Sequence, residues 1–434
     1  MTGHEYRYAV DQTVSTLHLE GRLKSSLSLG EKYATASADY NGFHGKAACR
    51  ISDLNDSSAQ KIIKTSIYRA FIRAGGERPP WGALTGVRPG KLMRPLMDTE
   101  EFSRQYDVSP ERSTLCYETA LYTEKAENSL EDGDVCLYVG IPFCPTRCAY
   151  CSFVSASVEK SMKLIGPFLD ALYKEIENTE INGRIVSIYF GGGTPTTLSD
   201  VQLDELISRL AERYDLSEVR EFTVEAGRPD TITKEKLEVL SKHGVTRVSV
   251  NPQTMRDSVL EAIGRKHSAQ DIRDAISMVR KYTDFDINMD LIAGLPSDTV
   301  EGFKETVDEV IALSPENITI HTLSLKNGSA ITIKGTDIPS AAEVGEMLDY
   351  AYKRLRCEKY SPYYLYRQKN MSGGFENTGW TKENHENLYN ICMMEELSSV
   401  IALGAGGSTK IIDGGRITRK VNPKYPKEYI EKYV

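Results

Sequence analysis

Three absences in this sequence each exclude a class of protein. No stretch approaches the ~18 consecutive apolar residues typical of a membrane-spanning helix, so we expect no membrane span. The opening residues, MTGHEYRYAVDQ, lack the basic and apolar regions of a secretory signal, and we therefore expect a cytoplasmic protein. There is no surplus of positive charge, because 53 basic residues face 61 acidic ones, a net charge of −8. Nucleic acid is therefore not expected as the main partner.

The length of 434 residues is enough for two or three domains with a large core. Residues 1–130 predict an N-terminal α+β domain, with a helix at about Ser58–Ala74 followed by a basic loop rich in Pro and Gly. The strands expected in this domain are Tyr6–Val10, Ser15–Leu19, Thr35–Tyr40 and Ala47–Ile51.

Residues 131–335 alternate between short apolar strands and amphipathic helices, which predicts parallel strands joined by right-handed crossovers. The expected strands are Cys136–Ile141, Ile185–Phe190, Glu221–Glu225, Arg247–Asn251, Asp286–Ile292 and Asn317–Leu323, and the expected helix caps include Ser199, Thr233, Ser268 and Asp298. Periodicity alone leaves open a partial barrel or an open doubly wound sheet. In either fold the chemistry belongs at the carboxyl ends of the strands. The pattern breaks after about residue 335, so residues 336–434 form a third part.

Three of the eight cysteines fall within eight residues, and this cluster is the most informative feature of the chain. Cys144, Cys148 and Cys151 are spaced C-x3-C-x2-C directly after the first strand of the middle part. A disulfide framework is not expected in a reducing compartment. Three thiolates on one tight loop can bind one metal centre, either zinc or an iron–sulfur cubane with one iron left for another ligand. The other five cysteines are scattered and are expected to be buried thiols.

This cysteine spacing resembles that of the radical S-adenosylmethionine (SAM) superfamily. The further motifs YFGGGTPTTL, EFTVEAGRPD, NPQT, IGRKHS and MDLIAGLP follow in the order found in the oxygen-independent coproporphyrinogen III oxidase family. PPWGALTGVRPGKL and RQKNMSGGFENTGW resemble its HemZ-type branch. The resemblance covers nearly the whole chain. It implies an α/β fold, a partial (β/α)6 radical SAM barrel preceded by the N-terminal α+β domain and followed by a C-terminal capping segment.

The resemblance also implies two cofactors and their ligands. Cys144, Cys148 and Cys151 match the cysteines that bind a [4Fe–4S] cluster, whose open iron is chelated by SAM. The positions that match SAM contacts are Tyr138, Gly192 and Glu225 for the cleaved SAM, Gly193, Thr194, Gln253, Arg265 and Asp290 for a second SAM, Tyr150 beside the last cysteine, and Ser324 as a weaker candidate for the adenine end. Without the resemblance, the glycines read as a tight turn and the polar residues as strand-end groups.

The implied reaction begins with one-electron cleavage of SAM to methionine and a 5′-deoxyadenosyl radical. This radical takes hydrogen from a propionate of coproporphyrinogen III, and loss of CO2 and an electron leaves a vinyl group. Repeated once, the reaction gives protoporphyrinogen IX in anaerobic haem biosynthesis. The implied partners are a tetrapyrrole substrate and a low-potential electron donor of the flavodoxin or ferredoxin type.

One position departs from the oxidase pattern. The oxidase proper has a further cysteine two residues after the third ligand, whereas this chain has Phe153, as the haem-chaperone branch does. Two alternatives therefore stay open, a non-enzymatic haem-transfer protein that retains the cluster, and a radical SAM enzyme such as a methyltransferase acting on another tetrapyrrole. No residue is identified as catalytic. His321 fits a packed histidine better than a catalytic one, and the basic loop fits solvated charge as well as a propionate site.

Overall fold

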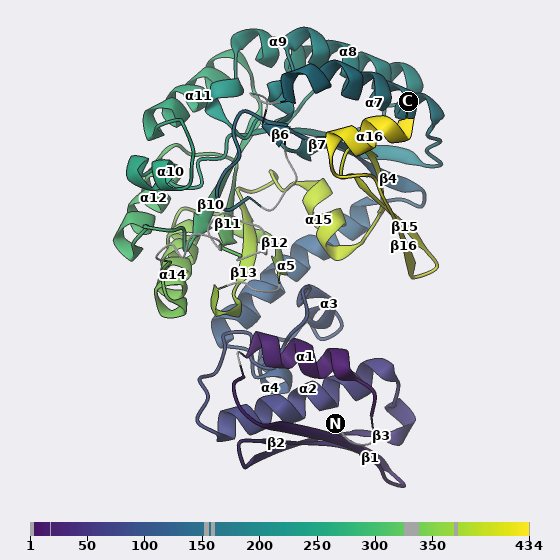
Figure 1. Cartoon of the computed structure of the whole chain (residues 1–434), viewed down its shortest axis with the longest axis vertical. Helices are drawn as coiled ribbons and strands as arrows, with labels where there is room; N and C mark the ends of the chain where they lie inside the picture. The colour runs from purple at the N-terminus through teal and green to yellow at the C-terminus, as the bar shows by residue number, and fades with distance from the viewer. Residues whose placement is uncertain are drawn as a thin grey trace. The chain divides into compact units, whose positions relative to one another are not determined.

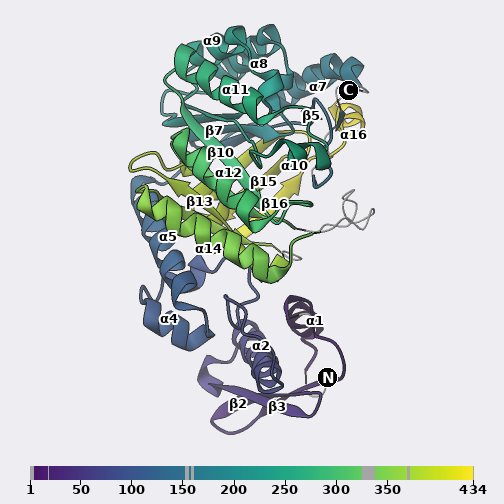
Figure 2. The same ribbon diagram turned by 90° about the vertical axis from the view of Figure 1, so that its left-hand side faces the viewer.

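The computed structural model describes residues 4–17, 19–151, 156–157, 161–324, 338–368 and 372–433. The chain divides into two compact units (Figures 1 and 2). The first comprises Met1–Tyr117 with Arg367–Phe375, and the second comprises Glu118–Tyr366 with Glu376–Val434. None of the described helices is both long enough and apolar enough to span a bilayer.

The first unit is built on a three-stranded antiparallel sheet in the order β1 (Leu23–Leu29), β2 (Tyr33–Tyr40) and β3 (Phe43–Arg50). Alternate alanines of β2 are buried against the apolar stripe of α2 (Asp56–Arg73), as the period of two in a strand requires. The remaining elements are the short helix η1 (Ile51–Asp53) and the helices α1 (Arg7–Thr16), α3 (Gly90–Met93), α4 (Thr99–Tyr106) and α5 (Pro110–Ser129), of which α5 continues into the second unit.

The expected strands Tyr6–Val10 and Ser15–Leu19 are wrong, because Arg7–Thr16 forms α1. The buried residues Ala9, Thr13 and Leu17 recur every four positions, which is the spacing of one helix face. In segments this short, the spacing of one helix face is not distinguishable from the alternation of apolar and polar residues in a strand. The expected strands Thr35–Tyr40 and Ala47–Ile51 correspond to β2 and β3.

The second unit contains an eleven-stranded sheet in the order β12-β13-β11-β10-β9-β8-β7-β4-β14-β15-β16. Its central strands are β4 (Asp134–Ile141), β7 (Arg184–Gly192), β8 (Glu221–Glu225), β9 (Arg247–Ser249), β10 (Asp286–Ala293) and β11 (Asn317–Thr322), all mutually parallel. The two-stranded sheet β5 (Phe143–Cys144) and β6 (Ala156–Ser157) lies beyond β4 in sequence. The six predicted strands are thus confirmed, each within three residues at its ends.

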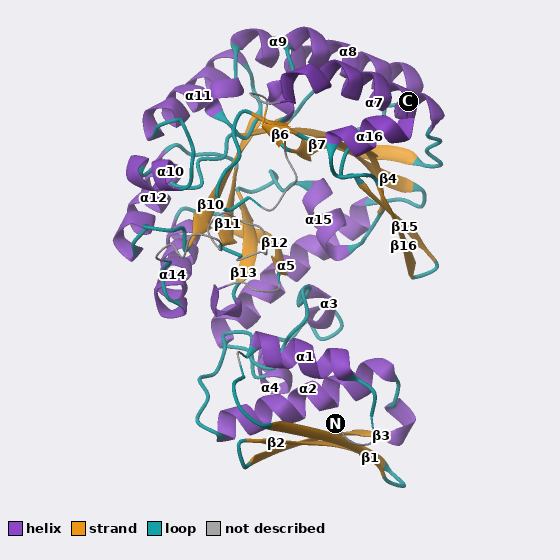
Figure 3. Cartoon of the chain, viewed as in Figure 1, coloured by secondary structure: helices purple, strands orange, loops and turns teal. Residues whose placement is uncertain are grey.

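Helices cover the outer face of this curved sheet (Figure 3). They are α7 (Ile165–Asn178), α8 (Asp200–Arg213), α9 (Lys234–Lys242), α10 (Asp257–Ala262), α11 (Ala269–Tyr282) and α12 (Val300–Ala312), with the short helices η2 (Met162–Leu164), η3 (Pro195–Thr197) and η4 (Pro229–Thr231) between them. Ser199, Thr233 and Ser268 cap helices as predicted. The cap of α12 is Thr299 rather than Asp298, because the Thr299 hydroxyl accepts the Gly302 N–H at 3.1 Å.

The residues after 337, predicted as a capping segment, extend the sheet at both edges. β12 (Ser361–Arg367) and β13 (Glu376–Thr381) continue it beyond β11, with η5 (Ser372–Gly374) between them. β14 (Ser399–Gly404) pairs in parallel with β4, and β15 (Ser408–Asp413) and β16 (Arg416–Val421) follow antiparallel. α14 (Ala341–Cys357) packs on α12, α16 (Pro426–Tyr433) packs on α7, and α15 (Leu388–Glu395) lies inside the curve of the sheet (Figure 1).

Candidate functional site

The three clustered cysteines lie on the loop that follows β4, at the carboxyl edge of the sheet. Cys144 ends the short strand β5, and the Cys151 N–H bonds to the Cys148 carbonyl at 3.1 Å, which closes a tight turn. The Ala149 N–H bonds to the Ile263 carbonyl at 2.9 Å and ties the loop to the end of α10. All three thiols are partly exposed and none is in a disulfide. The predicted location of the cluster is therefore an accessible strand-end loop.

The donor set of this loop fits an iron–sulfur cluster, because thiolates are the protein ligands such clusters use. Among the described residues, however, no group of three or more His, Cys, Asp or Glu side chains is close enough to hold a metal ion. The expectation that the other five cysteines are buried thiols holds for Cys116, Cys136 and Cys392. It is wrong for Cys49, which is only partly buried, and for Cys357, which is exposed at the end of α14.

The glycine turn after β7 lies against the cysteine loop. Gly192 has a φ of +102°, a backbone conformation that favours glycine. A Cβ on Gly193 would lie 2.4 Å from the Phe143 carbonyl oxygen, so a side chain there would clash with the loop. The Thr194 N–H bonds to that same carbonyl at 2.7 Å, and the Thr194 hydroxyl lies 3.5 Å from Cys144 Sγ as a donor. The predicted residues Gly192, Gly193 and Thr194 thus stand beside Cys144.

Three tyrosines stack on the inner face of the sheet next to Glu225. The ring centroids of Tyr189 and Tyr389 are 4.5 Å apart, and Tyr138 stacks at 6.2 Å from each. The Tyr189 hydroxyl donates to Glu225 Oε1 at 2.6 Å. Tyr138 and Glu225 were predicted, whereas Tyr189 and Tyr389 were missed. Tyr189 on β7 is the register partner of Tyr138 on β4, so its place beside Tyr138 can be inferred once the register of these two strands is known.

Burial governs the ionisation of the two carboxylates at this site. Loss of water raises the pKa of Glu225 to about 7, although the Tyr189 hydroxyl and the Gly192 N–H act in the opposite direction. Burial also opposes ionisation of Asp290, but His321 and Asn288 face its carboxylate and hold the pKa of Asp290 below its usual value. Asn288 donates to Asp290 Oδ1 at 2.8 Å, and His321 Nε2 lies 3.8 Å from Oδ2. His321, expected as a packed histidine, is partly exposed and faces Asp290.

A buried cationic group supports the other side of the cysteine loop. Arg265 donates to the Asn251 carbonyl at 2.5 Å and to the Tyr150 hydroxyl at 3.0 Å. Burial opposes the charge on Arg265, yet the neighbouring Tyr150 and Cys148 raise its pKa. Arg228, which was not predicted, donates to the Thr146 hydroxyl between the first two cysteines at 2.9 Å.

Several polar atoms in this region are buried and have no hydrogen-bond partner among the residues that the structure describes. They are Arg228 Nη2, Arg265 Nε, Asn251 Oδ1 and both ring nitrogens of His267. Burial, with Arg265 and Arg228 nearby, lowers the pKa of His267 to about 3, so the ring is neutral near pH 7. Because buried polar atoms are normally paired, this concentration is typical of a place that receives a polar ligand.

Gln253 and Ser324 are the remaining predicted positions. Gln253 is buried with a φ of +68°, and its backbone bridges to β10 through the Asp290 carbonyl at 2.8 Å, which places it beside Asp290. Ser324 is partly buried and follows the end of β11. Phe153 lies outside the described residues.

Comparison with known proteins agrees with this arrangement. The radical SAM superfamily profile matches residues 138–310. The chain is 37% identical over 412 residues to the oxygen-independent coproporphyrinogen-III oxidase-like protein HemZ of Bacillus subtilis, covering 88% of this chain and 81% of that protein. It is 32% identical over 230 residues to the haem chaperone HemW of Lactococcus lactis, covering 52% of this chain and 60% of that protein.

The structure is similar to that of coproporphyrinogen III oxidase (HemN) from Escherichia coli, described as a radical SAM enzyme. The TM-score is 0.58 at 21% identity, over 72% of this chain and 71% of that chain, so this likeness concerns the fold. The match to HemZ extends over most of both chains and carries the assignment. The chain therefore belongs to the radical SAM superfamily, in the family of oxygen-independent coproporphyrinogen III oxidase-like proteins.

Proposed function

We propose that this protein is an oxygen-independent coproporphyrinogen III oxidase, which converts two propionates of coproporphyrinogen III to the vinyl groups of protoporphyrinogen IX. The cofactors of its superfamily are a [4Fe–4S] cluster and SAM. When both are bound, they supply the one-electron cleavage of SAM. The substrate is then a tetrapyrrole, and the partner is a low-potential electron donor of the flavodoxin or ferredoxin type.

In this proposal Cys144, Cys148 and Cys151 bind the cluster. The loop that carries them is partly exposed and is tied at Ala149 to the end of α10, so its thiols are accessible to incoming iron. Arg228 holds the loop through its hydrogen bond to the Thr146 hydroxyl.

The residues around the glycine turn bind and orient SAM. Gly192 and Gly193 keep side chains away from the edge of the loop, which leaves backbone polar groups free to approach a ligand. Glu225 is oriented by the Tyr189 hydroxyl and, when ionised, accepts hydrogen bonds from a ribose hydroxyl or an ammonium group. Tyr138 offers a ring face on the same side. Gln253, Arg265 and Asp290 supply a second group of polar contacts along the edge.

The observation that supports the proposal best is the juxtaposition of the cysteine loop and the glycine turn. The Thr194 hydroxyl beside Cys144 Sγ joins the two motifs, which are fifty positions apart in sequence. If the cluster were bound here, the glycine turn would lie against the loop that holds it, and Glu225 would be linked to that turn through the Gly192 N–H.

The test is an anaerobic incubation of the reconstituted protein with coproporphyrinogen III, SAM and a reductant. We expect protoporphyrinogen IX together with 5′-deoxyadenosine and methionine, resolved by liquid chromatography. Cleavage of SAM without any loss of CO2 from coproporphyrinogen would contradict the proposal, because the cofactors would then be working on a different substrate.

A second candidate function is haem transfer without catalysis. Two observations favour it, Phe153 in place of the additional cysteine and the likeness to the haem chaperone HemW. In this case the protein binds haem in a one-to-one ratio and releases it to an acceptor, and coproporphyrinogen is not consumed. Haem titration followed by absorbance, alongside the incubation above, separates the two functions.

A further inference from the structure

Helix α15 is an unusual element, because it lies inside the curve of the sheet rather than among the outer helices (Figure 1). It comprises Leu388–Glu395, and neither the expected cluster nor the expected SAM contacts fall on it. Its buried residues include Tyr389, whose ring stacks on Tyr189 at 4.5 Å with 22° between the planes. Through Tyr189 this helix reaches Glu225, a predicted contact of SAM.

Tyr389 belongs to the group of tyrosines next to Glu225. Tyr138, Tyr189 and Tyr389 form one stack beside this carboxylate, and the charged or polar groups that also face it are Asp290 on β10, His321 on β11 and the Gly192 N–H. Burial raises the pKa of Tyr389, and the nearby Glu225 carboxylate raises it further. Removal of the Tyr389 ring would expose one side of the stack.

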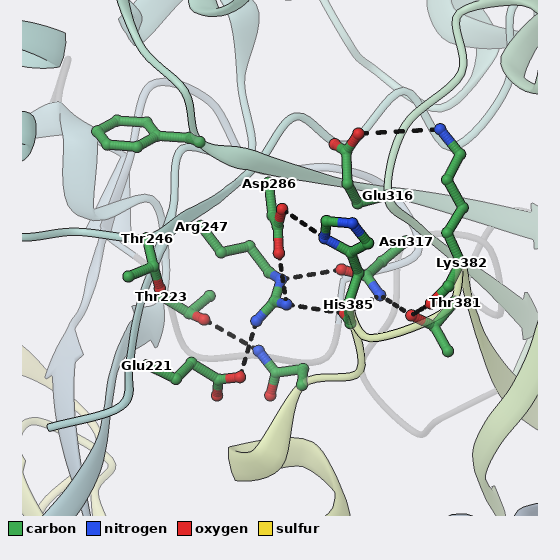
Figure 4. Close-up of polar contacts among 12 residues, drawn as sticks. Glu221, Thr223, Thr246, Arg247, Asp286, Glu316, Asn317, Thr381, Lys382 and His385 are labelled. Atoms are coloured by element: carbon green, nitrogen blue, oxygen red, sulfur yellow. Dashed lines mark hydrogen bonds and ion pairs between the residues drawn. The ribbon is translucent and has the colours of Figure 1, made fainter.

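The helix is held in this place by a polar cluster at the opposite edge of the sheet (Figure 4). Arg247, the first residue of β9, is buried and donates to Glu221 at 2.8 Å, to Asp286 at 2.9 Å and to Asn317 at 2.9 Å. These three partners are the first residues of β8, β10 and β11. Arg247 also donates to the His385 carbonyl at 2.8 Å, just before α15.

The same cluster fixes the first turn of α15. Both Glu221 oxygens accept from the helix, at 2.9 Å from the Leu388 N–H and at 3.1 Å from the Tyr389 N–H. Asn387 caps the helix through the Asn390 N–H at 2.8 Å and donates to the Thr223 hydroxyl at 2.9 Å. The helix start is therefore bonded to the sheet through ionised and amide side chains, and the position of Tyr389 follows from it.

We propose that Tyr389 is a positioning residue of the SAM site, which completes the aromatic wall around Glu225, and that the Arg247 cluster is the anchor that holds it there. This inference rests on the proposed function only in taking SAM as the ligand. Arg247 and its partners, which bond at the amino edge of the sheet, thus influence the binding of SAM at the carboxyl edge through Tyr389.

The experiment measures SAM affinity by calorimetry with the full-length, cluster-loaded protein under anaerobic conditions. Tyr389→Leu removes the ring, Tyr389→Phe keeps it, and Arg247→Gln loosens the anchor. We expect SAM affinity to fall about tenfold in Tyr389→Leu and Arg247→Gln and to stay within about twofold of wild type in Tyr389→Phe. Tyr214→Leu, a buried tyrosine on the outer side whose hydroxyl bonds to the Ile176 carbonyl, is the matched control and should leave affinity unchanged.

Two further readouts separate positioning from general packing. Hydrogen exchange at residues 388–390 should become faster in Arg247→Gln, and the Tyr389→Leu/Arg247→Gln double variant should bind SAM no more weakly than Tyr389→Leu, since both act through one ring. The pH midpoint of SAM binding should move to lower pH in Tyr389→Leu, because water then reaches Glu225. If Arg247→Gln does not fold, Asn387→Ala releases the same helix start more mildly.

Unchanged SAM affinity and pH midpoint in a folded Tyr389→Leu protein would overturn the inference, as would additive effects in the double variant. Failure of the proposed function looks different. In that case wild-type protein and Tyr389→Phe bind SAM and Tyr389→Leu binds it weakly, but none of them converts coproporphyrinogen. A wild-type protein that does not bind SAM overturns both.

Discussion

The two edges of the parallel sheet are built in opposite ways. At the amino edge, the side chains of Arg247, Glu221, Asp286 and Asn317 bond to one another and to the start of α15 (Figure 4). At the carboxyl edge, Arg228, Arg265, Asn251 and His267 each have a buried polar atom that finds no partner within the described part of the chain. Unpaired buried groups reduce stability, whereas paired ones hold elements in place. The contrast indicates one edge that organises the fold and another that is completed by a ligand.

Loss of a cluster ligand should have the largest effect on the carboxyl edge. Cys144→Ala removes one of three thiols, so we expect bound iron and SAM cleavage to fall to background, as iron and sulfide assays and chromatography can show. Cys357→Ala changes an exposed cysteine outside the loop and should retain full iron content. Equal losses in both variants would remove the distinction between the loop and the remaining cysteines.

The amino edge should respond to substitution through stability. Arg247→Met leaves Glu221 and Asp286 without their shared cation, and the free energy of unfolding should drop by about 3–5 kcal/mol, measured by urea titration. Lys234→Met breaks the exposed pair with Glu238 at 3.3 Å and should lower the free energy of unfolding far less than Arg247→Met does, because water screens an exposed pair. A small effect at Arg247 would mean that the amino edge is not the organising one.

The pH dependence of stability should reveal Glu225. Its pKa is about 7 in the folded protein against 4.5 as the ordinary value, so the unfolded chain loses its proton first as pH rises. Glu225 therefore lowers stability progressively between pH 4.5 and 7, by about 3 kcal/mol at most, since one pKa unit corresponds to about 1.4 kcal/mol. The stability advantage of Glu225→Gln over wild type should grow across this window and be absent below it. If the difference in free energy of unfolding between Glu225→Gln and wild type does not change with pH, then Glu225 is in contact with water.

The smallest expected effect concerns the unpaired histidine. His267→Leu removes two buried ring nitrogens that lack partners, so the free energy of unfolding of the ligand-free protein should rise by about 1 kcal/mol. His243→Leu removes a histidine that is paired with Asp204 at 2.6 Å and should lower stability instead. Thermal unfolding of both variants compares the two cases, and equal destabilisation would show that His267 has an unrecognised packing role.

The carboxyl edge could largely be predicted from sequence, and the amino edge could not. The cysteine spacing and the glycine run are local patterns, and strand–helix alternation shows which residues end the strands. The family resemblance, and not these patterns, connects Gly192 and Glu225 with SAM. Glu221, Arg247, Asp286 and Asn317 begin four separate strands and share no spacing or motif. These four side chains meet only because of the order of the strands in the sheet. α15 contacts them because it lies inside the curve of the sheet, although it is distant from these strands in sequence.

The fold of the first residues could not be predicted from periodicity. The segment Arg7–Thr16 is so short that its apolar residues fit both the period of a strand and that of a helix. Its packing against α2 in the folded protein favours the helix.

The pairing of β14 with β4 has a consequence for how the protein is made. Ser399 aligns with Val135, so strand β4 lacks one of its two neighbours until more than 260 further residues have left the ribosome. During that time it presents an open hydrogen-bonding edge to other nascent chains. A contact of such long range closes late in folding. The sheet that carries the site is thus completed only by a segment synthesised long after β4, and a chain stopped before Ser399 would be left prone to aggregate.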